Sequence, residues 1–346
     1  MGGGAAVAAF ASRPGDRMNR RRALLVALCA TVLSPLRTAA QSPERVYRIG
    51  LLGSTSRKIP AVARFYRALE QGLRDLGYVE GRNLILEYRG AEGRQERLPQ
   101  LAAELVALKV DLIIASTDTA ALAAKDVSRT VPIVFVAAGD PVGIGLVESL
   151  ARPGGNVTGF ASFTETVVGK QFELLSEVVP GMSRLAVLYG SGAAASGVQL
   201  REIKTAGTRF KLEVRLHDVR AGEAMEDAFR AIRESGPEAL QVLPSVTTFL
   251  HRARIAEFAR AKRLPSVYGL AENVEAGGLM SYSFSYADNF RRSALYADKI
   301  LKGARPADLP VEQPVQFELV VNLRTARDIG VSIPSSVLVR ADRVIE

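Results

Sequence analysis

The sequence is poor in the residues that build most catalytic and metal centres. It holds one cysteine, two histidines and no tryptophan among 346 residues. Cys29 lies in an apolar N-terminal segment that we expect to be removed, so the remaining chain has no thiol for disulfides, thiolate catalysis or metal binding. His217 and His251 are isolated and lack the His-x-x-x-His spacing of zinc sites. We therefore expect no metal centre.

Signatures of nucleotide binding and nucleophilic catalysis are missing too. No Gly-x-x-x-x-Gly-Lys-Ser/Thr phosphate loop and no Gly-x-Ser-x-Gly elbow occurs. Gly143 and Gly145 are followed by Glu148, where a dinucleotide fingerprint needs a third glycine. General-base chemistry would fall on a carboxylate, and Asp140 is the one that the pattern places at a strand end in a cleft. We expect no cofactor and no enzyme; a secreted α/β enzyme that uses Asp140 is an alternative.

Basic charge is concentrated at the N-terminus. The formal net charge is +9, of which residues 1–40 carry +5 through six arginines and Asp16, which leaves +4 for the rest. The remaining basic residues are scattered among acidic ones and form no long run. This distribution indicates a mixed-charge surface and no nucleic-acid partner.

The N-terminal segment has the features of an export signal. Residues 18–22 end in three arginines, residues 23–36 are apolar, and Thr38-Ala39-Ala40 offers small side chains for cleavage. We expect residues 18–40 to be a signal peptide, residues 1–17 an upstream extension, and the mature protein periplasmic. No other segment reaches the ~18 apolar residues of a spanning helix.

Residues 110–150 repeat one design. A buried strand at 112–114 leads through polar residues to a helix at 120–127, and a second strand at 133–136 leads to a helix predicted over 143–150. Continuous apolar strands that alternate with helices indicate a parallel sheet covered on both faces.

The alternation runs through most of the chain and starts afresh near residue 167. We expect two α/β halves with a cleft between them, which is the commonest place for a small ligand. The other expected strands cover 47–52, 83–88, 157–160, 184–189, 211–216, 239–243, 265–268, 279–283 and 315–320. The other expected helices cover 61–76, 95–108, 167–179, 193–206, 222–234, 246–262, 287–301 and 322–329.

Hydroxyl groups follow the first and third strands of this pattern. At these positions helix N-termini are expected to present unpaired N–H groups, and the hydroxyl residues there are Ser54, Thr55, Ser116 and Thr117. A ligand carboxylate or polar headgroup would therefore find hydroxyl groups and a favourable helix dipole together. Each of them could instead only cap a helix. Asp140 could orient a ligand ammonium or amide, or cap the helix expected after it.

Tyrosines lie at or near strand ends in the second half of the chain. Tyr189, Tyr268 and Tyr282 could sandwich a flat ligand at low entropic cost, or take part in ordinary packing.

Several segments together resemble the substrate-binding proteins of bacterial ABC transporters, in the family of the tryptophan/tyrosine-type binding protein. The resemblance covers residues 46–346. The matching segments are 72–83 (GLRDLGYVEGRN), 110–114 (VDLII), 132–136 (PIVFV), 139–142 (GDPV), 152–159 (RPGGNVTG), 185–189 (LAVLY), 264–265 (LP), 276–282 (AGGLMSY), 299–303 (KILKG) and 306–310 (PADLP).

The resemblance implies a periplasmic-binding-protein-like α/β fold: two Rossmann-like lobes with parallel sheets and a cleft between them. It assigns 46–159 plus about 286–310 to lobe 1, and 160–285 plus about 311–346 to lobe 2. It also adds Ser245 to the ligand-binding residues Ser54, Ser116, Thr117, Asp140, Tyr189, Tyr268 and Tyr282. Two departures fall in the pocket: Ser245-Val246 stands where relatives often carry an acid, and Thr117-Asp118-Thr119-Ala120 where many have Thr-Pro-Ala-Ala.

The implied function is that of a monomeric extracytoplasmic solute-binding protein of an ABC importer. It would capture a small polar or amino-acid-like ligand by hinge closure and deliver it to a permease and, through it, an ATPase. The alternative is a sensory module that docks on a membrane signalling receptor. Because the departures lie in the pocket, an aromatic amino acid is not carried over as the ligand.

Overall fold

The computed structural model describes residues 45–162, 165–190, 196–219 and 225–346. Within it, Val46–Glu346 form one compact unit. The expected signal peptide, its upstream extension and Cys29 lie outside the described residues. In the described part of the chain, no helix combines the length and the apolar character needed to cross a membrane.

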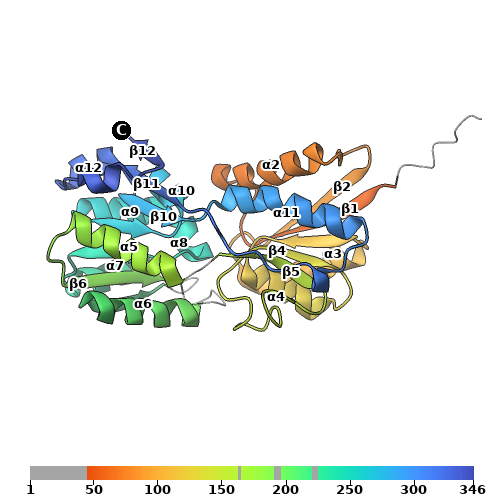
Figure 1. Ribbon diagram of the computed structural model, residues 1–346, viewed down its shortest axis with the longest axis horizontal. Coiled ribbons are helices and arrows are strands. Elements are labelled where there is room, and N and C mark those ends of the chain that lie inside the picture. Colours follow the sequence, from red (N-terminus) through yellow and green to blue (C-terminus); the bar gives the residue numbers. More distant parts are fainter. Residues whose placement is uncertain (1–44, 163–164, 191–195, 220–224) are drawn as a thin grey trace, which may run out of the picture. The chain divides into compact units, whose positions relative to one another are not determined.

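Lobe 1 is built on a five-stranded parallel sheet with the order β2-β1-β3-β4-β5 (Figure 1). Its strands are β1 (Tyr47–Gly53), β2 (Leu84–Gly90), β3 (Leu112–Ala115), β4 (Ile133–Ala138) and β5 (Val157–Ala161). Every residue of β3, β4 and β5 is buried, because helices cover both faces of the sheet. The predicted buried parallel strands are confirmed here.

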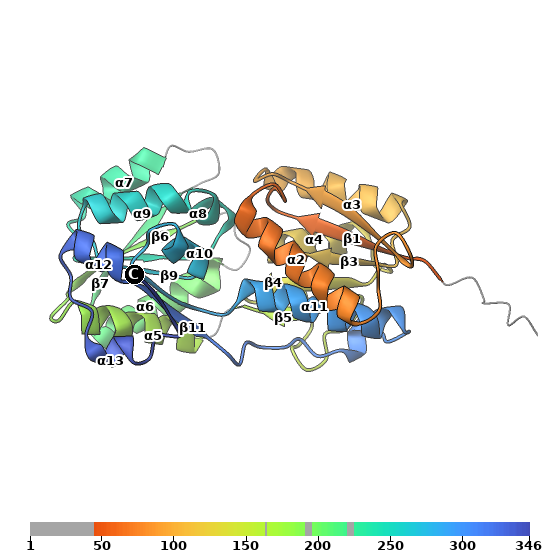
Figure 2. The ribbon, with the colours of Figure 1, turned by 90° about the horizontal axis from the view of Figure 1, so that it is seen from above.

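Two helices lie on each face of this sheet. They are α2 (Pro60–Asp75) and α11 (Tyr286–Leu301) on one face, and α3 (Leu98–Ala107) and α4 (Asp118–Val127) on the other, with the short η1 (Gln95–Arg97) before α3. Leu51 of β1 points to α2 and α11, and the next residue, Leu52, belongs to the core under α3 and α4. Figures 1 and 2 both show α2 and α11 side by side, although most of lobe 2 separates them in sequence.

Lobe 2 carries a seven-stranded sheet with the order β12-β11-β10-β9-β8-β6-β7. Its strands are β6 (Arg184–Tyr189), β7 (Glu213–Asp218), β8 (Ala239–Val242), β9 (Ser266–Tyr268), β10 (Met280–Ser283), β11 (Glu318–Asn322) and β12 (Arg343–Ile345). Its helices are α5 (Glu165–Val178), α6 (Ser196–Phe210), α7 (Met225–Glu234), α8 (Val246–Leu250), α9 (Arg252–Ala261), α10 (Ala271–Glu275), α12 (Leu323–Ile329) and α13 (Ser335–Leu338). β11 runs antiparallel to β10, whereas the other neighbouring strands are parallel.

The chain passes between the lobes three times. It leaves lobe 1 after β5, returns between β10 and α11, and leaves again after the short η2 (Pro306–Asp308), before β11. The backbone N–H of Ala161 donates to Glu312 at 2.8 Å, so two crossing segments run side by side.

The helix predicted over 143–150 is wrong. Residues 141–145 form turns and 146–150 are irregular, because Gly145 adopts a left-handed φ of +69° and Asp140 Oδ1 accepts the Gly143 N–H at 2.8 Å. Leu146 and Val147 both donate their N–H groups to the Pro141 carbonyl, at 2.9 and 3.0 Å. The cap predicted at Asp140 therefore exists, but it closes a turn.

Two further predicted elements differ from the structure. The helix expected over 246–262 is two helices, α8 and α9, which meet at His251. The strand expected over 315–320 begins only at Glu318, and Val315 is 83% exposed.

A pocket at the facing strand ends of the two lobes

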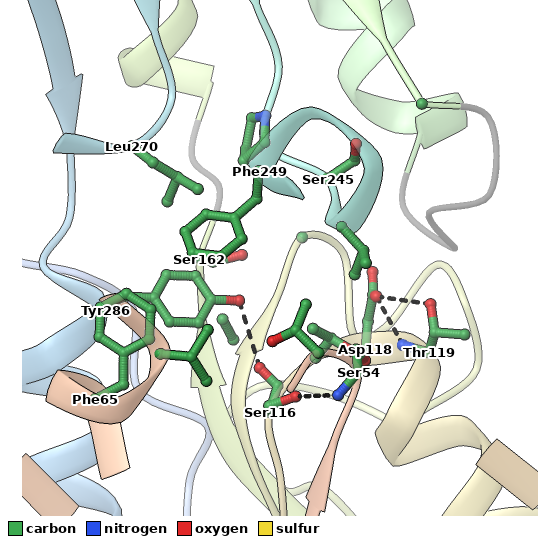
Figure 3. Close-up of a pocket in the computed structure, with 18 of the residues that line it drawn as sticks. Ser54, Phe65, Ser116, Asp118, Thr119, Ser162, Ser245, Phe249, Leu270 and Tyr286 are labelled. Atoms are coloured by element: carbon green, nitrogen blue, oxygen red, sulfur yellow. Dashed lines mark hydrogen bonds between the residues drawn. The ribbon is translucent and has the colours of Figure 1, made fainter. Parts of the chain in front are cut away.

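A cavity of about 150 Å³ lies between the two lobes (Figure 3). Lobe 1 lines it with residues that follow β1, β3, β4 and β5, and lobe 2 with residues that follow β6, β8, β9 and β10. In open α/β sheets this edge, beyond the carboxyl ends of the strands, is where ligands bind. The fold therefore brings two such edges together over one small-molecule-sized space.

Hydroxyl groups of lobe 1 form one wall. The Ser54 N–H donates to Ser116 Oγ at 3.1 Å, and Ser54 Oγ lies 2.7 Å from Thr117 Oγ1. β1 and β3 are neighbours in the sheet, so their ends place these three residues together. Ser54 is fully buried, and the cluster is a fixed polar wall with one carboxylate beside it.

That carboxylate belongs to Asp118 at the start of α4. Thr117 is the N-cap of this helix and accepts the Ala120 N–H at 3.2 Å. Asp118 Oδ1 accepts the Thr119 N–H at 2.7 Å and lies 3.2 Å from Thr119 Oγ1. Figure 3 shows Asp118 and Thr119 on the same side of the pocket as Ser54 and Ser116.

Lobe 2 contributes the start of α8. Ser245 caps this helix in a reciprocal capping box with Thr248: its Oγ accepts the Thr248 N–H at 3.1 Å, and its N–H donates to Thr248 Oγ1 at 3.0 Å. Gly190, after β6, lies so close that a side-chain carbon there would stand 2.6 Å from Ser245 Oγ. This rim of the pocket is therefore tightly packed.

Aromatic rings form the opposite wall. Phe65 of α2 lies 6.4 Å from Phe249 of α8 and 5.4 Å from Tyr286 of α11, between ring centroids, and stacks on Phe290 at 5.7 Å. Phe284, after β10, lies 5.3 Å from Tyr286. Phe65 and Phe249 come from different lobes, so this wall is complete only when the lobes are together (Figure 3).

The tyrosine hydroxyls at this wall stay protonated at physiological pH. Burial raises the pKa of Tyr286 well above its usual value, and the charges of Asp118 and Glu272 add to the rise. Burial likewise raises the pKa of Tyr66. The Tyr286 hydroxyl points toward the Ser116 carbonyl at 3.4 Å, so the aromatic and hydroxyl walls meet there.

The structure brings five of the nine residues expected to bind ligand into one cavity. They are Ser54, Thr55, Ser116, Thr117 and Ser245. All five follow strands that end at the pocket.

The other four do not line the cavity. Asp140 closes the turn that follows β4. Tyr189 packs against the core of lobe 2. Tyr268 is fully buried, and burial raises its pKa to about 12. Tyr282 stacks on Phe317 with ring centroids 5.5 Å apart.

The aromatic wall is what reasoning from strand ends missed. Phe65 and Phe249 lie inside the helices expected over 61–76 and 246–262, which carry no strand-end signal. The close spacing of Phe284 and Tyr286, just after a strand and at the start of a helix, is the signal that could have indicated them.

Two lobes of parallel-stranded α/β structure, three crossing segments and a pocket at facing strand ends define the bilobed periplasmic-binding-protein class. The chain belongs to the ABC transporter substrate-binding protein family, whose model matches residues 58–345.

Relatives of known name agree with this assignment. A tyrosine-binding protein of Clostridioides difficile (strain R20291) is 24% identical over 269 residues, which cover 78% of this chain and 77% of that protein. A crystal structure of an ABC domain in complex with L-Trp from Streptococcus pneumoniae is 27% identical, has a TM-score of 0.81 and covers 87% of this chain and 100% of its own. A conserved domain protein from Vibrio cholerae gives the same identity, TM-score and coverage.

Proposed function

We propose that this protein is the extracytoplasmic receptor of an ABC importer, which captures an amino acid with an aromatic or apolar side chain. The observation that carries the proposal is the composition of the pocket. One wall is polar, the other is aromatic, and each lobe supplies part of both. Relatives named for tyrosine binding and solved with L-Trp support an amino-acid ligand.

Capture would proceed by closure of the lobes about their three crossing segments. A ligand that contacts Phe65 of lobe 1 and Phe249 of lobe 2 stabilises the closed form over the open form by the free energy of those added contacts. The closed monomer would then dock on a permease and its ATPase, which release the ligand across the membrane. No bond of the ligand is made or broken in this cycle.

A thermal-shift screen of the purified protein against amino acids, sugars and dicarboxylates tests the proposal. A ligand present at about 100 times its Kd adds about 2.7 kcal/mol to the free energy of unfolding, and thus raises Tm by several degrees. We expect aromatic amino acids to give the largest shifts. If no amino acid raises Tm at millimolar concentration, the proposal fails.

A further inference from the structure

Two helix starts at the pocket are already capped by the chain. At α4, Thr117 Oγ1 accepts the Ala120 N–H, and at α8, Ser245 Oγ accepts the Thr248 N–H. A ligand carboxylate would compete with these caps for the same backbone donors. The carboxylate of an amino-acid ligand therefore needs donors other than the ones that the sequence pattern indicated.

Two primary amides line the cavity, one from each lobe. Gln95 follows β2 in lobe 1, and Gln199 lies in the first turn of α6 in lobe 2. Among the described residues that line the cavity, these are the side chains that carry an NH2 group. Such a group can donate two hydrogen bonds, whereas a hydroxyl group donates one. The amides are thus the richest side-chain donors in the described part of the pocket.

Burial distinguishes the two amides. Gln199 is only 7% exposed, and no described residue forms a hydrogen bond with its side chain. Gln95 is half-buried, with an Oε1 atom that is buried without a partner, and water can reach the rest of its side chain. Buried polar groups in native proteins are normally hydrogen-bonded, because an unpaired one destabilises the fold. For Gln199, a molecule inside the cavity is what can supply the missing partner.

The helix that carries Gln199 favours an anion at the same place. α6 is 15 residues long, and no acidic side chain lies in its first turn. The N-terminal end of a helix carries a partial positive charge, which stabilises a negative group nearby. A ligand carboxylate beside Gln199 would gain both the amide donors and this dipole.

We infer that Gln199 determines ligand specificity by donating its side-chain N–H groups to the ligand carboxylate. This inference rests on the proposed function and deepens it. The contact comes from lobe 2, whereas Ser54, Ser116 and Thr117 belong to lobe 1, so a ligand that reaches both sets of groups holds the lobes together. A compound without the carboxylate loses this contact, whatever its ring.

Isothermal titration with matched compounds tests the inference on the wild-type protein. The panel contains L-tyrosine, L-tryptophan and L-phenylalanine, and the corresponding primary carboxamides, which keep the shape of the headgroup but lose its negative charge. Hydrogen bonds to charged groups are stronger than those to neutral ones, so each carboxamide should bind at least about tenfold more weakly than its amino acid. A carboxamide that binds as tightly as its amino acid overturns the inference and leaves the proposed function standing. A panel with no binder overturns both.

Two variants of Gln199 assign the effect to one side chain. Gln199→Met keeps the length but removes the donors, so the preference for amino acids over carboxamides should fall to less than about threefold. We expect this variant to fold, because it removes no hydrogen bond to a described residue. Gln199→Glu should invert the preference, because its carboxylate repels the ligand carboxylate and accepts an N–H of the carboxamide.

The matched control is Gln100→Glu. Gln100 is exposed on α3 and does not line the cavity, so the same added charge there should leave the preference as in the wild type. An unchanged preference in Gln199→Met, with circular dichroism like the wild type, refutes the contact even if Gln199→Glu inverts the preference through its charge. If one of the two Gln199 variants does not fold, the other decides.

Discussion

Arg64 on α2 and Glu275 on α10 form an ion pair that joins the two lobes. Glu275 also accepts a hydrogen bond of 2.9 Å from Arg343 on the C-terminal strand β12. One carboxylate thus holds lobe 1 against two elements of lobe 2. We call Arg64, Glu275 and Arg343 the inter-lobe pair group.

Breaking this group should weaken ligand binding without touching the pocket. Partly exposed ion pairs contribute about 0.2–1 kcal/mol, so Glu275→Gln or Arg64→Ala should raise Kd about two- to fivefold, mainly through faster dissociation from a less stable closed form. Stopped-flow release of a bound ligand measures this. Arg305→Ala is the control, because the exposed Arg305–Asp308 pair does not join the lobes. Equal dissociation rates in all these variants would refute the effect.

The same group should make ligand affinity depend on pH in the acid range. Burial alone would raise the pKa of Glu275, but hydrogen bonds from Arg64 and Arg343 outweigh it and hold that pKa below its usual 4.5. Because the pKa of Glu275 is lowered, the contribution of its ion pairs to the closed form is fully present above pH 4.5. It is lost as the pH falls through the lowered pKa. The wild-type affinity should thus exceed that of Glu275→Gln from neutral pH down to 4.5, and this difference should shrink below. A difference that stays constant into strong acid would contradict this.

Phe249 should matter for affinity and Phe229 only for stability. Phe249→Leu removes a ring that faces Phe65 across the lobes, and aromatic pairs contribute about 0.5–1.5 kcal/mol beyond their buried area, so Kd for an aromatic ligand should rise about two- to tenfold. Phe229 stacks on Phe258 at 4.2 Å, and neither lines the pocket, so Phe229→Leu should lower Tm and leave Kd unchanged. Titration calorimetry and thermal denaturation separate the two outcomes. If Phe229→Leu lost affinity too, the rise in Kd for Phe249→Leu could not be assigned to the aromatic wall of the pocket.

Gly159 on β5 should tolerate no side chain. Its φ is +153°, and a side-chain carbon would stand 2.1 Å from the Phe135 carbonyl oxygen of β4. Gly159→Ala must distort the sheet beneath the pocket, so the free energy of unfolding should fall by more than about 3 kcal/mol.

Gly303 is the matched position, with φ of +102° and nothing near its side-chain site. Gly303→Ala introduces only backbone strain, so its free energy of unfolding should fall by about 1–2 kcal/mol. Urea titration of both variants measures the difference. A Gly159→Ala protein as stable as Gly303→Ala would contradict the close approach of β4 and β5.

Most of the fold follows from the hydrophobic pattern. The runs at 112–114 and 133–136 have no polar side that could face water, so only a doubly covered parallel sheet suits them. The error at 143–150 has a local cause: apolar spacing suggested a helix, but Gly143 and Gly145 permit turns, and Asp140 and Pro141 supply the bonds that close them.

The site was less accessible to sequence reasoning. Strand ends indicated Ser54 and Ser116, because parallel strands deliver their following residues to one edge, and the family resemblance added Ser245. Whether a strand-end tyrosine points into the cleft or into the core is not set by its place in the sequence, and Tyr268 belongs to a core cluster of lobe 2. The partnership of Phe65 with Phe249 depends on how two lobes meet, which no local pattern contains.

The packing of α2 against α11 has a consequence for biosynthesis. During translation, α2 emerges early, but the helix that covers Phe65, Leu69 and Leu73 appears only after nearly all of lobe 2 has been made. A nascent chain released before residue 301 therefore leaves the apolar face of α2 exposed and cannot complete lobe 1. Lobe 1 can therefore complete its fold only when the chain is almost full length.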